Sequence, residues 1–376
     1  MNDNRRIVEL DGLRGLAVWM VLGWHFLGSL VDRSGPVEEA IRTFTIFGRT
    51  GVDLFFVLSG FLIVGRLIDN RSAPNAFRVF YWRRFLRIWP PYLALIVAYW
   101  LCYLWVGETG AFNTSYGVLT QLLAQLTFKW DALMAVTNSG VAAGFAVTWS
   151  VAIEEWFYLL APPIIFAFAA ARLPVVLLVI GTASLAGRIA VYCAFPTHDL
   201  APYVLTPLRL DGLCVGGLVA WGIRQPNILE WSRANRQRIG SVASAFIVTL
   251  PVLIGALQSN LDWHMYIWGH TYLSLGFAAL LVAVWQRPGS KQTSLFRTPM
   301  LVAGGLWSYT IYLFHPLFLN LFFILAGRER PVVRSPQDAL VAAAALGATI
   351  VFSIISYRLM ERPLQALGHR SRYGGQ

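Results

Sequence analysis

Long apolar segments recur along this chain, each close to the 20 residues that an α-helix needs to cross the hydrocarbon core of a bilayer. Short polar stretches separate them. The segments lie at about 10–31, 47–66, 89–107, 149–170, 174–194, 206–223, 239–257, 268–286, 301–326 and 338–357. This pattern predicts an all-α integral membrane protein with about ten transmembrane helices.

The segment 116–130 is also apolar, but it is short and contains Gln121, Gln125 and Lys129. With ten spans and both termini in the cytoplasm, most Arg and Lys residues fall in inner loops, as the positive-inside rule requires. An eleventh span at 116–130 would place most of the later basic loops outside. We therefore expect this segment to be re-entrant or to lie on the surface, within a long outer loop from about 108 to 148.

The composition agrees with a membrane protein and narrows the possible functions. Hydrophobic residues make up 57% of the chain and charged residues 13%, whereas soluble domains are about a quarter charged. The net charge of +11 gathers in short loops between apolar segments, so we expect contact with a lipid bilayer and none with nucleic acid. The three cysteines, Cys102, Cys193 and Cys214, are far apart in apolar surroundings and predict neither disulfides nor a metal site.

Ionisable side chains within the predicted helices are costly in lipid, so each is a candidate functional group. Arg14 falls near the inner face. A larger set falls in the outer halves of the spans: His25, Asp53, Glu154, Glu155, Arg188, Arg209, Asp211 and His315. Their common depth predicts a polar cavity open to the outer side.

Arg14 and His25 are eleven residues apart, so they share one face of the first helix and lie about 16 Å apart along its axis. An extended pantetheine arm spans that distance, with its phosphate end at Arg14 and its thioester at His25. His25 beside acids suits general-base catalysis. The alternative is a core histidine hydrogen-bonded between helices.

Several of the other groups also have structural interpretations. Asp53 can cap its helix or pair with Arg49, four residues earlier. Arg209 and Asp211 can pair with each other or cap the sixth span. His315 precedes a proline, so it sits where the helix kinks and frees a carbonyl, and a structural role competes with a chemical one.

The acids Glu154 and Glu155 are adjacent, so they face different sides of their helix. Helical spacing places Glu154 on one face with Ser150, Val151 and Tyr158. The residues alone leave open which acid faces a cavity.

The most basic stretch is YWRRFLRIWPP, residues 81–91. Arg84 and Arg87 lie on one face of a helix at the inner membrane surface. The stretch is either a topology signal that binds anionic lipid or a clamp for phosphates, which guanidinium groups bind in bidentate fashion.

These stretches together resemble the acyltransferase-3 family of membrane-bound acyltransferases. The matching segments are 10–26 (LDGLRGLAVWMVLGWHF), 51–63 (GVDLFFVLSGFLI), 81–92 (YWRRFLRIWPPY), 148–162 (TWSVAIEEWFYLLAP), 209–220 (RLDGLCVGGLVA), 307–316 (WSYTIYLFHP) and 357–363 (YRLMERP). In this family, the Arg and His of the first helix and the RxxR motif before the third helix are regarded as essential. Here these are Arg14, His25, Arg84 and Arg87.

The resemblance implies transfer of an acyl group, often acetyl, from a coenzyme A thioester to a hydroxyl of a cell-surface glycan, a glycolipid or a small molecule. It implies acyl-CoA as a co-substrate, no tightly bound cofactor and a place in the bacterial inner (plasma) membrane. Many members carry a further hydrolase-like domain, and this sequence is expected to be the stand-alone form. We expect one acyltransferase domain over residues 1–363 and a disordered, basic cytoplasmic tail over 364–376. Trp156 departs from the family, which commonly has Gln there.

The resulting hypothesis places the donor phosphates on Arg14, Arg84 and Arg87. His25 removes the proton of the acceptor hydroxyl as the oxygen attacks the thioester. An acyl-histidine intermediate is an open alternative.

Glu154 or Asp53 is expected to orient the His25 imidazole. Arg209, Tyr309 and His315 are weaker candidates for the acceptor side or the oxyanion. The rival functions are a multi-pass transporter of a glycan or small molecule, for which clearer repeats are expected, and a non-enzymatic lipid-binding scaffold.

Overall fold

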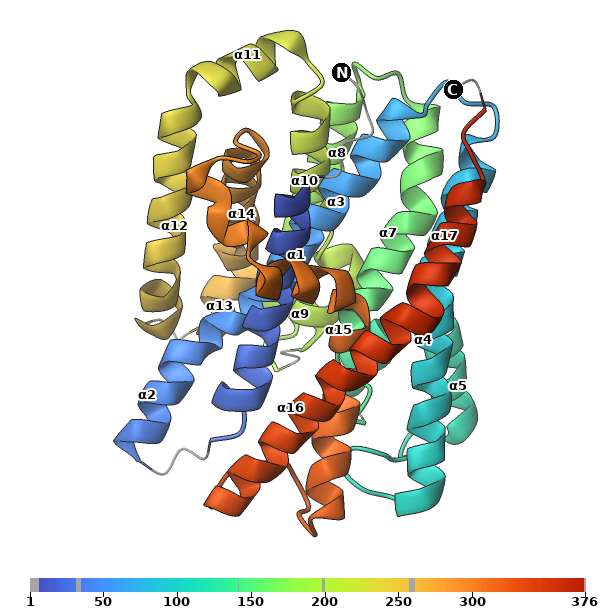
Figure 1. Ribbon diagram of the computed structural model, residues 1–376, viewed down its shortest axis with the longest axis vertical. Coiled ribbons are helices and arrows are strands. Elements are labelled where there is room, and N and C mark those ends of the chain that lie inside the picture. The colour runs from blue at the N-terminus through green and yellow to red at the C-terminus, as the bar shows by residue number, and fades with distance from the viewer. Residues whose placement is uncertain (1–6, 32–34, 141, 198–199, 257–260, 375–376) are drawn as a thin grey trace.

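The protein is an all-α bundle in the computed structural model, which describes residues 7–31, 35–140, 142–197, 200–256 and 261–374 (Figure 1). Within these residues the extended pairing is confined to one isolated bridge, between Val31 and Val333. The ends of the predicted domain and tail, residues 1–6 and 375–376, lie outside the described part.

Every predicted span coincides with a helix. The ten helices are α1 (Val8–Gly23), α3 (Gly51–Asp69), α4 (Ala76–Val106), α7 (Thr148–Ala167), α8 (Leu173–Ala194), α10 (Asp211–Gly222), α12 (Arg236–Ala256), α14 (His270–Trp285), α15 (Pro299–Leu325) and α16 (Pro336–Ser356). Eight helical segments of the described chain are long and apolar enough to cross a membrane, and α1 and α10 are not among them. Both pack against several other helices, since α1 contacts α15 and α3, and α10 contacts α3, α8 and α14. The chain is a multi-pass membrane protein, and the count of ten spans stays a prediction.

The segment between α4 and α7 contains two short helices, α5 (Val118–Leu126) and α6 (Trp130–Thr137). Neither approaches the length that crosses a bilayer. Gln125 fixes α5 against α4, because its backbone carbonyl accepts a hydrogen bond from the Tyr92 hydroxyl (2.9 Å) and its side-chain oxygen accepts one from Trp100 Nε1 (2.9 Å). The described chain therefore places no spanning helix over 116–130.

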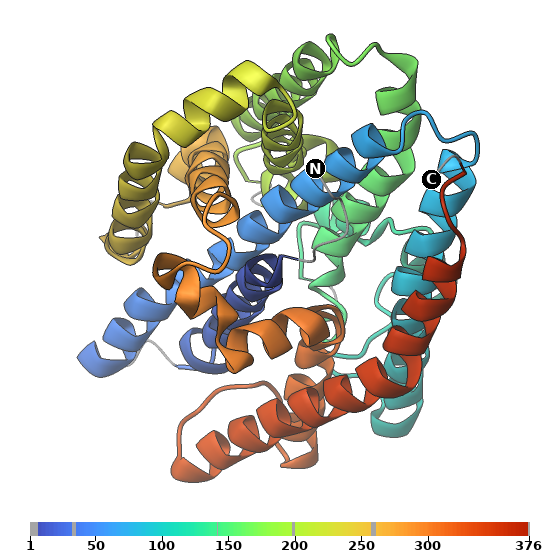
Figure 2. The same cartoon turned by 45° about the horizontal axis from the view of Figure 1, so that its top comes forward.

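Successive helices run up and down, so that the turns with most basic residues meet at one end of the bundle (Figures 1 and 2). This end holds the α3–α4 and α7–α8 turns and α11 (Pro226–Ala234), which joins α10 to α12. The start of α1 lies there too, because Glu9 accepts a hydrogen bond from Gly289 (2.7 Å) in the α14–α15 connection. α2 (Pro36–Thr45) and the start of α16 lie toward the opposite end.

The tail expected to be disordered is ordered through residue 374. α16 continues through a π-helical turn (Tyr357–Glu361) into α17 (Arg362–Arg370), which packs on α4. Arg83 donates to the Ser371 carbonyl (2.6 Å), and Asn75 bonds the backbone of Arg372 (3.0 Å) and of Gly374 (2.7 Å). Hydrogen bonds between the Asn75 and Arg83 side chains and the backbone of residues 371–374 thus order this basic segment, although its composition alone suggested disorder.

Two glycines explain a close helix crossing, between α3 and α10. A Cβ at Gly60 would lie 1.9 Å from the Leu213 carbonyl oxygen, and one at Gly216 would lie 2.0 Å from that of Val57. Small residues permit such close approach between helices in membranes. This crossing fixes α3, which lines both cavities described below.

Candidate active site

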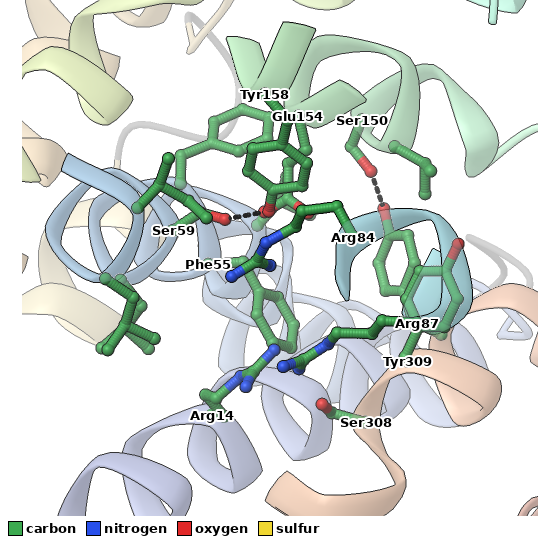
Figure 3. Close-up of a pocket in the computed structure, with 17 residues that line it drawn as sticks. Arg14, Phe55, Ser59, Arg84, Arg87, Ser150, Glu154, Tyr158, Ser308 and Tyr309 are labelled. Atoms are coloured by element: carbon green, nitrogen blue, oxygen red, sulfur yellow. Dashed lines mark hydrogen bonds between the residues drawn. The ribbon is translucent and has the colours of Figure 1, made fainter. Parts of the chain in front are cut away.

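A cavity of about 680 Å³ lies between α1, α3, α4, α7 and α15 (Figure 3). Its polar lining consists of Arg14, Ser59, Arg84, Arg87, Ser150, Glu154, Tyr158, Ser308, Tyr309 and Tyr312. Apolar side chains such as Phe55 and Phe56 complete the wall.

Three arginines from two helices converge in this cavity. Arg14 comes from α1, Arg84 and Arg87 come from α4, and their guanidinium groups point toward one another (Figure 3). Arg84 also lies over the Tyr158 ring, 5.1 Å from its centroid. Within the described chain none of the three guanidinium groups makes a hydrogen bond or ion pair. Like charges gathered in a partly buried site repel one another. An anion bound among the three arginines would reduce that repulsion.

Glu154 is the one acidic residue among those that line this cavity, and its carboxylate faces the arginines. It lies beside the hydroxyls of Ser59 and Tyr158, which are hydrogen-bonded to each other. Ser150, Val151 and Tyr158 line the same cavity, as their helical spacing predicts, and Glu155 does not line it. The structure therefore answers which of the two adjacent acids faces this site.

Prolines shape the helices that carry the site. Pro163 removes the N–H that would bond the Leu159 carbonyl, and this carbonyl accepts a hydrogen bond from the Tyr81 hydroxyl (2.8 Å). The bond ties α7 to α4 close to Arg84. The Tyr309 hydroxyl donates to the Ile88 carbonyl (3.2 Å), which ties α15 to α4 in the same region.

The cavity ends at a hydrogen bond between Ser150 Oγ and the Tyr312 hydroxyl (2.6 Å). Beyond it, the Tyr312 ring lies 5.8 Å from the His315 ring, and the His315 ring lies 4.7 Å from the His25 ring. His25 does not line the cavity, but only the His315 ring lies between it and Tyr312, which does. The two histidines are thus close to the wall of the cavity that holds the three arginines.

His25 lies on a π-helical turn (Trp24–Gly28) that continues α1, a rare feature that often marks functional sites. Its Nδ1 lies 3.0 Å from the Val21 carbonyl. A carbonyl can only accept, so Nδ1 carries the proton and the neutral ring presents the lone pair of Nε2. Neither Glu154 nor Asp53 is hydrogen-bonded to His25, so a backbone carbonyl takes the orienting position that the sequence hypothesis gave to an acid.

His315 has the structural role that its position before Pro316 suggested. The proline leaves the Tyr312 carbonyl without its helical partner, and His315 Nδ1 donates to that carbonyl (2.8 Å). His315 is fully buried, and its Nε2 has no hydrogen-bond partner in the described chain. This arrangement holds the ring against His25.

Asp53 and Arg209 pair with each other at 2.8 Å, across α3 and the turn before α10. Asp53 Oδ1 also accepts from His270 Nδ1 (3.1 Å). Arg209 lies over the rings of Phe56 and Trp149, at 5.7 and 5.9 Å. It does not line the first cavity, and the local pairing of Arg209 with Asp211 is wrong.

Arg188 is instead the partner of Asp211, through NH1 at 3.2 Å and NH2 at 2.9 Å. Its other donors bond the Tyr266 carbonyl (2.8 Å), the Leu208 carbonyl (2.7 Å) and the Thr271 hydroxyl (3.0 Å). Arg188 is fully buried with every donor group engaged, so it holds α8, α10 and α14 together.

The predicted single outer cavity is therefore wrong. Equal depth along the membrane does not fix the direction in which a side chain points, and the candidates separate into a cavity, a histidine pair and two ion-pair clusters. The sequence analysis also missed Ser59, Tyr158 and His270 as site residues. The spacing of Tyr158 from Glu154 and the place of His270 within the predicted span 268–286 were the available signals. Ser59 has no such signal, because its neighbours are distant in sequence.

The chain belongs to the acyltransferase-3 family, since the family model described as an acyltransferase domain matches residues 7–358. Similar curated proteins include the peptidoglycan O-acetyltransferase OatA of Listeria monocytogenes, 25% identical over 98% of this chain and 57% of that protein. Another is the O-acetyltransferase OatA of Staphylococcus aureus, 27% identical over 99% of this chain and 59% of that protein. The chain thus spans less than two thirds of these relatives. No solved structure matches it at a significant level.

Proposed function

We propose that this protein is an O-acyltransferase that moves an acyl group, most simply acetyl, from acyl-CoA to a hydroxyl of a cell-surface glycan in a bacterial plasma membrane. The observation that carries the proposal is the convergence of three arginines without hydrogen-bond partners in a cavity that leads to a histidine pair. The names of the relatives support acetyl as the acyl group and a glycan as the acceptor.

The arginine cluster suits the phosphates of coenzyme A. Phosphate oxygens accept charge-assisted hydrogen bonds, and guanidinium groups present paired donors that match them. Arg14, Arg84 and Arg87 outnumber the one lining carboxylate, so the lining of the cavity carries excess positive charge. A phosphate-bearing donor neutralises that charge. The eleven residues from Arg14 to His25 give the pantetheine arm about 16 Å to cross.

The histidine pair suits the transfer step. His25 Nε2 takes the proton of the acceptor hydroxyl while the oxygen attacks the thioester carbonyl. When the carbon–sulfur bond breaks, the thiolate leaves and His25 returns the proton, so that the products are the ester and free coenzyme A. The Tyr312 hydroxyl lines the cavity next to the histidines, bonded to Ser150 Oγ (2.6 Å) and to the Val147 carbonyl (3.3 Å). It can stabilise the developing oxyanion by exchanging the longer of these bonds for one to that oxygen.

The orientation follows from charge. The turns that gather at one end of the bundle hold most of the basic residues, which favours that end in the cytoplasm together with both termini. Acyl-CoA then enters from the cytoplasmic side, and the acceptor meets His25 from the other side.

The test uses the full chain purified in lipid nanodiscs. Coenzyme A binding is measured by titration calorimetry, and transfer is measured by release of free thiol from acetyl-CoA in the presence of a soluble glycan, with the acetylated product identified by mass. We expect saturable binding and acceptor-dependent thiol release. Absence of both coenzyme A binding and thiol release from correctly folded protein would refute the proposal.

A further inference from the structure

A second cavity, of about 470 Å³, lies beyond the wall formed by Phe56 and Trp149. Its polar lining consists of Arg49, Thr50, Asp53, Tyr203, Tyr266 and His270. These residues come from the start of α3 and the 3₁₀ turn before it (Ile46–Thr50), α9 (Leu200–Val204), the π-helical turn Met265–Gly269 and the start of α14. The cavity therefore lies away from the helix ends that carry the basic turns.

His270 gives this cavity a directed polar group. Its Nδ1 bonds Asp53 Oδ1 (3.1 Å), and the same carboxylate is neutralised by Arg209 at 2.8 Å. With that charge already balanced, the buried ring is neutral, Nδ1 donates to the carboxylate and Nε2 presents a lone pair. His270 is 2% exposed, and Nε2 has no hydrogen-bond partner in the described chain. A buried hydrogen-bond acceptor without a partner costs free energy. A ligand hydroxyl that donates to Nε2 would remove this cost.

Tyr203 supplies an aromatic ring beside this acceptor. Its ring lies 5.7 Å from that of His270 and 5.2 Å below the Arg49 guanidinium. The Tyr203 hydroxyl makes no hydrogen bond within the described chain, and the side chain is partly exposed. An aromatic face beside a few directed polar groups suits a ligand with both an apolar face and several hydroxyls, which is the chemistry of a sugar ring.

His25 is connected to both cavities through neighbouring side chains. On one side, the rings of His315 and Tyr312 connect it to the first cavity. On the other, the neighbouring Trp24 ring lies 5.8 Å from the guanidinium of Arg49, which lines the second cavity. A donor in the first cavity and an acceptor in the second would therefore both lie near this histidine.

We infer that the second cavity is the acceptor-binding site and takes a glycan, with one hydroxyl donating to His270 Nε2 and one sugar face against Tyr203. The inference rests on the proposed function, whose donor it leaves in the first cavity. Asp53 and Arg209 act as positioning residues here: the carboxylate fixes the His270 tautomer, and the guanidinium fixes the carboxylate.

The experiment compares two substitutions of His270 in the full chain in nanodiscs, with chitotetraose, the β-1,4-linked tetramer of N-acetylglucosamine, as the acceptor. In His270→Asn the amide can keep the donor toward Asp53 but removes the acceptor at Nε2. In His270→Gln the amide reaches the Nε2 position and offers an oxygen there. His369→Asn, in α17, is the control for a histidine outside both cavities.

We expect His270→Asn to raise the KM for chitotetraose by about 2- to 13-fold, the loss expected for one hydrogen bond, and His270→Gln to raise it less. The Kd for coenzyme A should stay within about twofold in both variants. An unchanged KM in folded His270→Asn protein would overturn the inference, as would an equal loss of coenzyme A affinity. So would a wild-type protein that binds coenzyme A but neither binds nor acetylates chitotetraose. Failure of the proposed function looks different: coenzyme A does not bind, while chitotetraose binding by calorimetry is still weakened by His270→Asn.

Discussion

Replacing Arg87 with alanine removes one of the three guanidinium groups that face the first cavity. In the described chain this group makes no hydrogen bond, so its loss breaks no internal contact of that kind, and it relieves repulsion from Arg14 and Arg84. We therefore expect the melting temperature and the membrane abundance of Arg87→Ala to equal or exceed those of the wild type.

Donor binding should respond in the opposite direction. A hydrogen bond to a charged group contributes about 1.5–3 kcal/mol, which corresponds to a Kd for coenzyme A that is about 13- to 160-fold weaker in Arg87→Ala. The arginines lie far from the histidine pair, so the KM for acetyl-CoA should rise more than kcat falls. If Arg87 binds the 3′-phosphate, dephospho-coenzyme A, which lacks this group, should bind wild type and variant with more similar affinities than coenzyme A does.

The assay is a titration of coenzyme A into nanodisc-embedded protein, normalised to the folded fraction, together with donor saturation curves. Arg78→Ala is the matched control, because Arg78 lies on the same helix but is exposed and lines neither cavity. If Arg87 serves only as a topology or lipid-binding residue, its loss lowers insertion and leaves the donor constants unchanged. That result would refute the reasoning.

Four other changes have expected outcomes. His25→Ala should insert and fold normally but lower transfer by about 10²–10⁴-fold, and near wild-type turnover at normal abundance would exclude His25 as the base; Glu154→Gln should also lose activity. Arg188→Ala should be destabilised by about 3–5 kcal/mol, because it leaves a buried carboxylate unpaired; a denaturation curve like that of the wild type would contradict this. Cysteines introduced at Asn113 and Asn75 should differ in labelling by an impermeant reagent on intact cells, with position 113 labelled and position 75 protected, and the reverse pattern would rule out the orientation.

Local sequence patterns were sufficient for the helices and for part of the site. Apolar runs of spanning length can satisfy their backbone hydrogen bonds in lipid only as helices, and each predicted span coincides with one. Residues close in sequence were also placed correctly: Ser150, Val151, Glu154 and Tyr158 line one cavity because the helical repeat fixes their common face. The kink role of His315 followed in the same way from the proline beside it.

Relations between distant segments were decided only by the tertiary structure. Arg209 pairs with Asp53 rather than with nearby Asp211, and Asp211 pairs with Arg188, because these partners lie on different helices whose rotation about their own axes no local pattern reveals. The partner of His270 could not be predicted in the same way, because Asp53 is 217 residues away.

The sequence by itself thus determined the class of protein, the positions of its membrane helices and the arginine and histidine motifs of its family. The tertiary structure decided which of these charged groups belong to the fold and which face a cavity. The physical reason is that a helix in lipid forms from its own composition, whereas the value of a buried charge depends on its neighbours. Arg188, with every donor group bonded, holds helices together. Arg14, Arg84 and Arg87 have equally charged side chains, but they face one cavity without hydrogen-bond partners in the described chain, where an anion can bind.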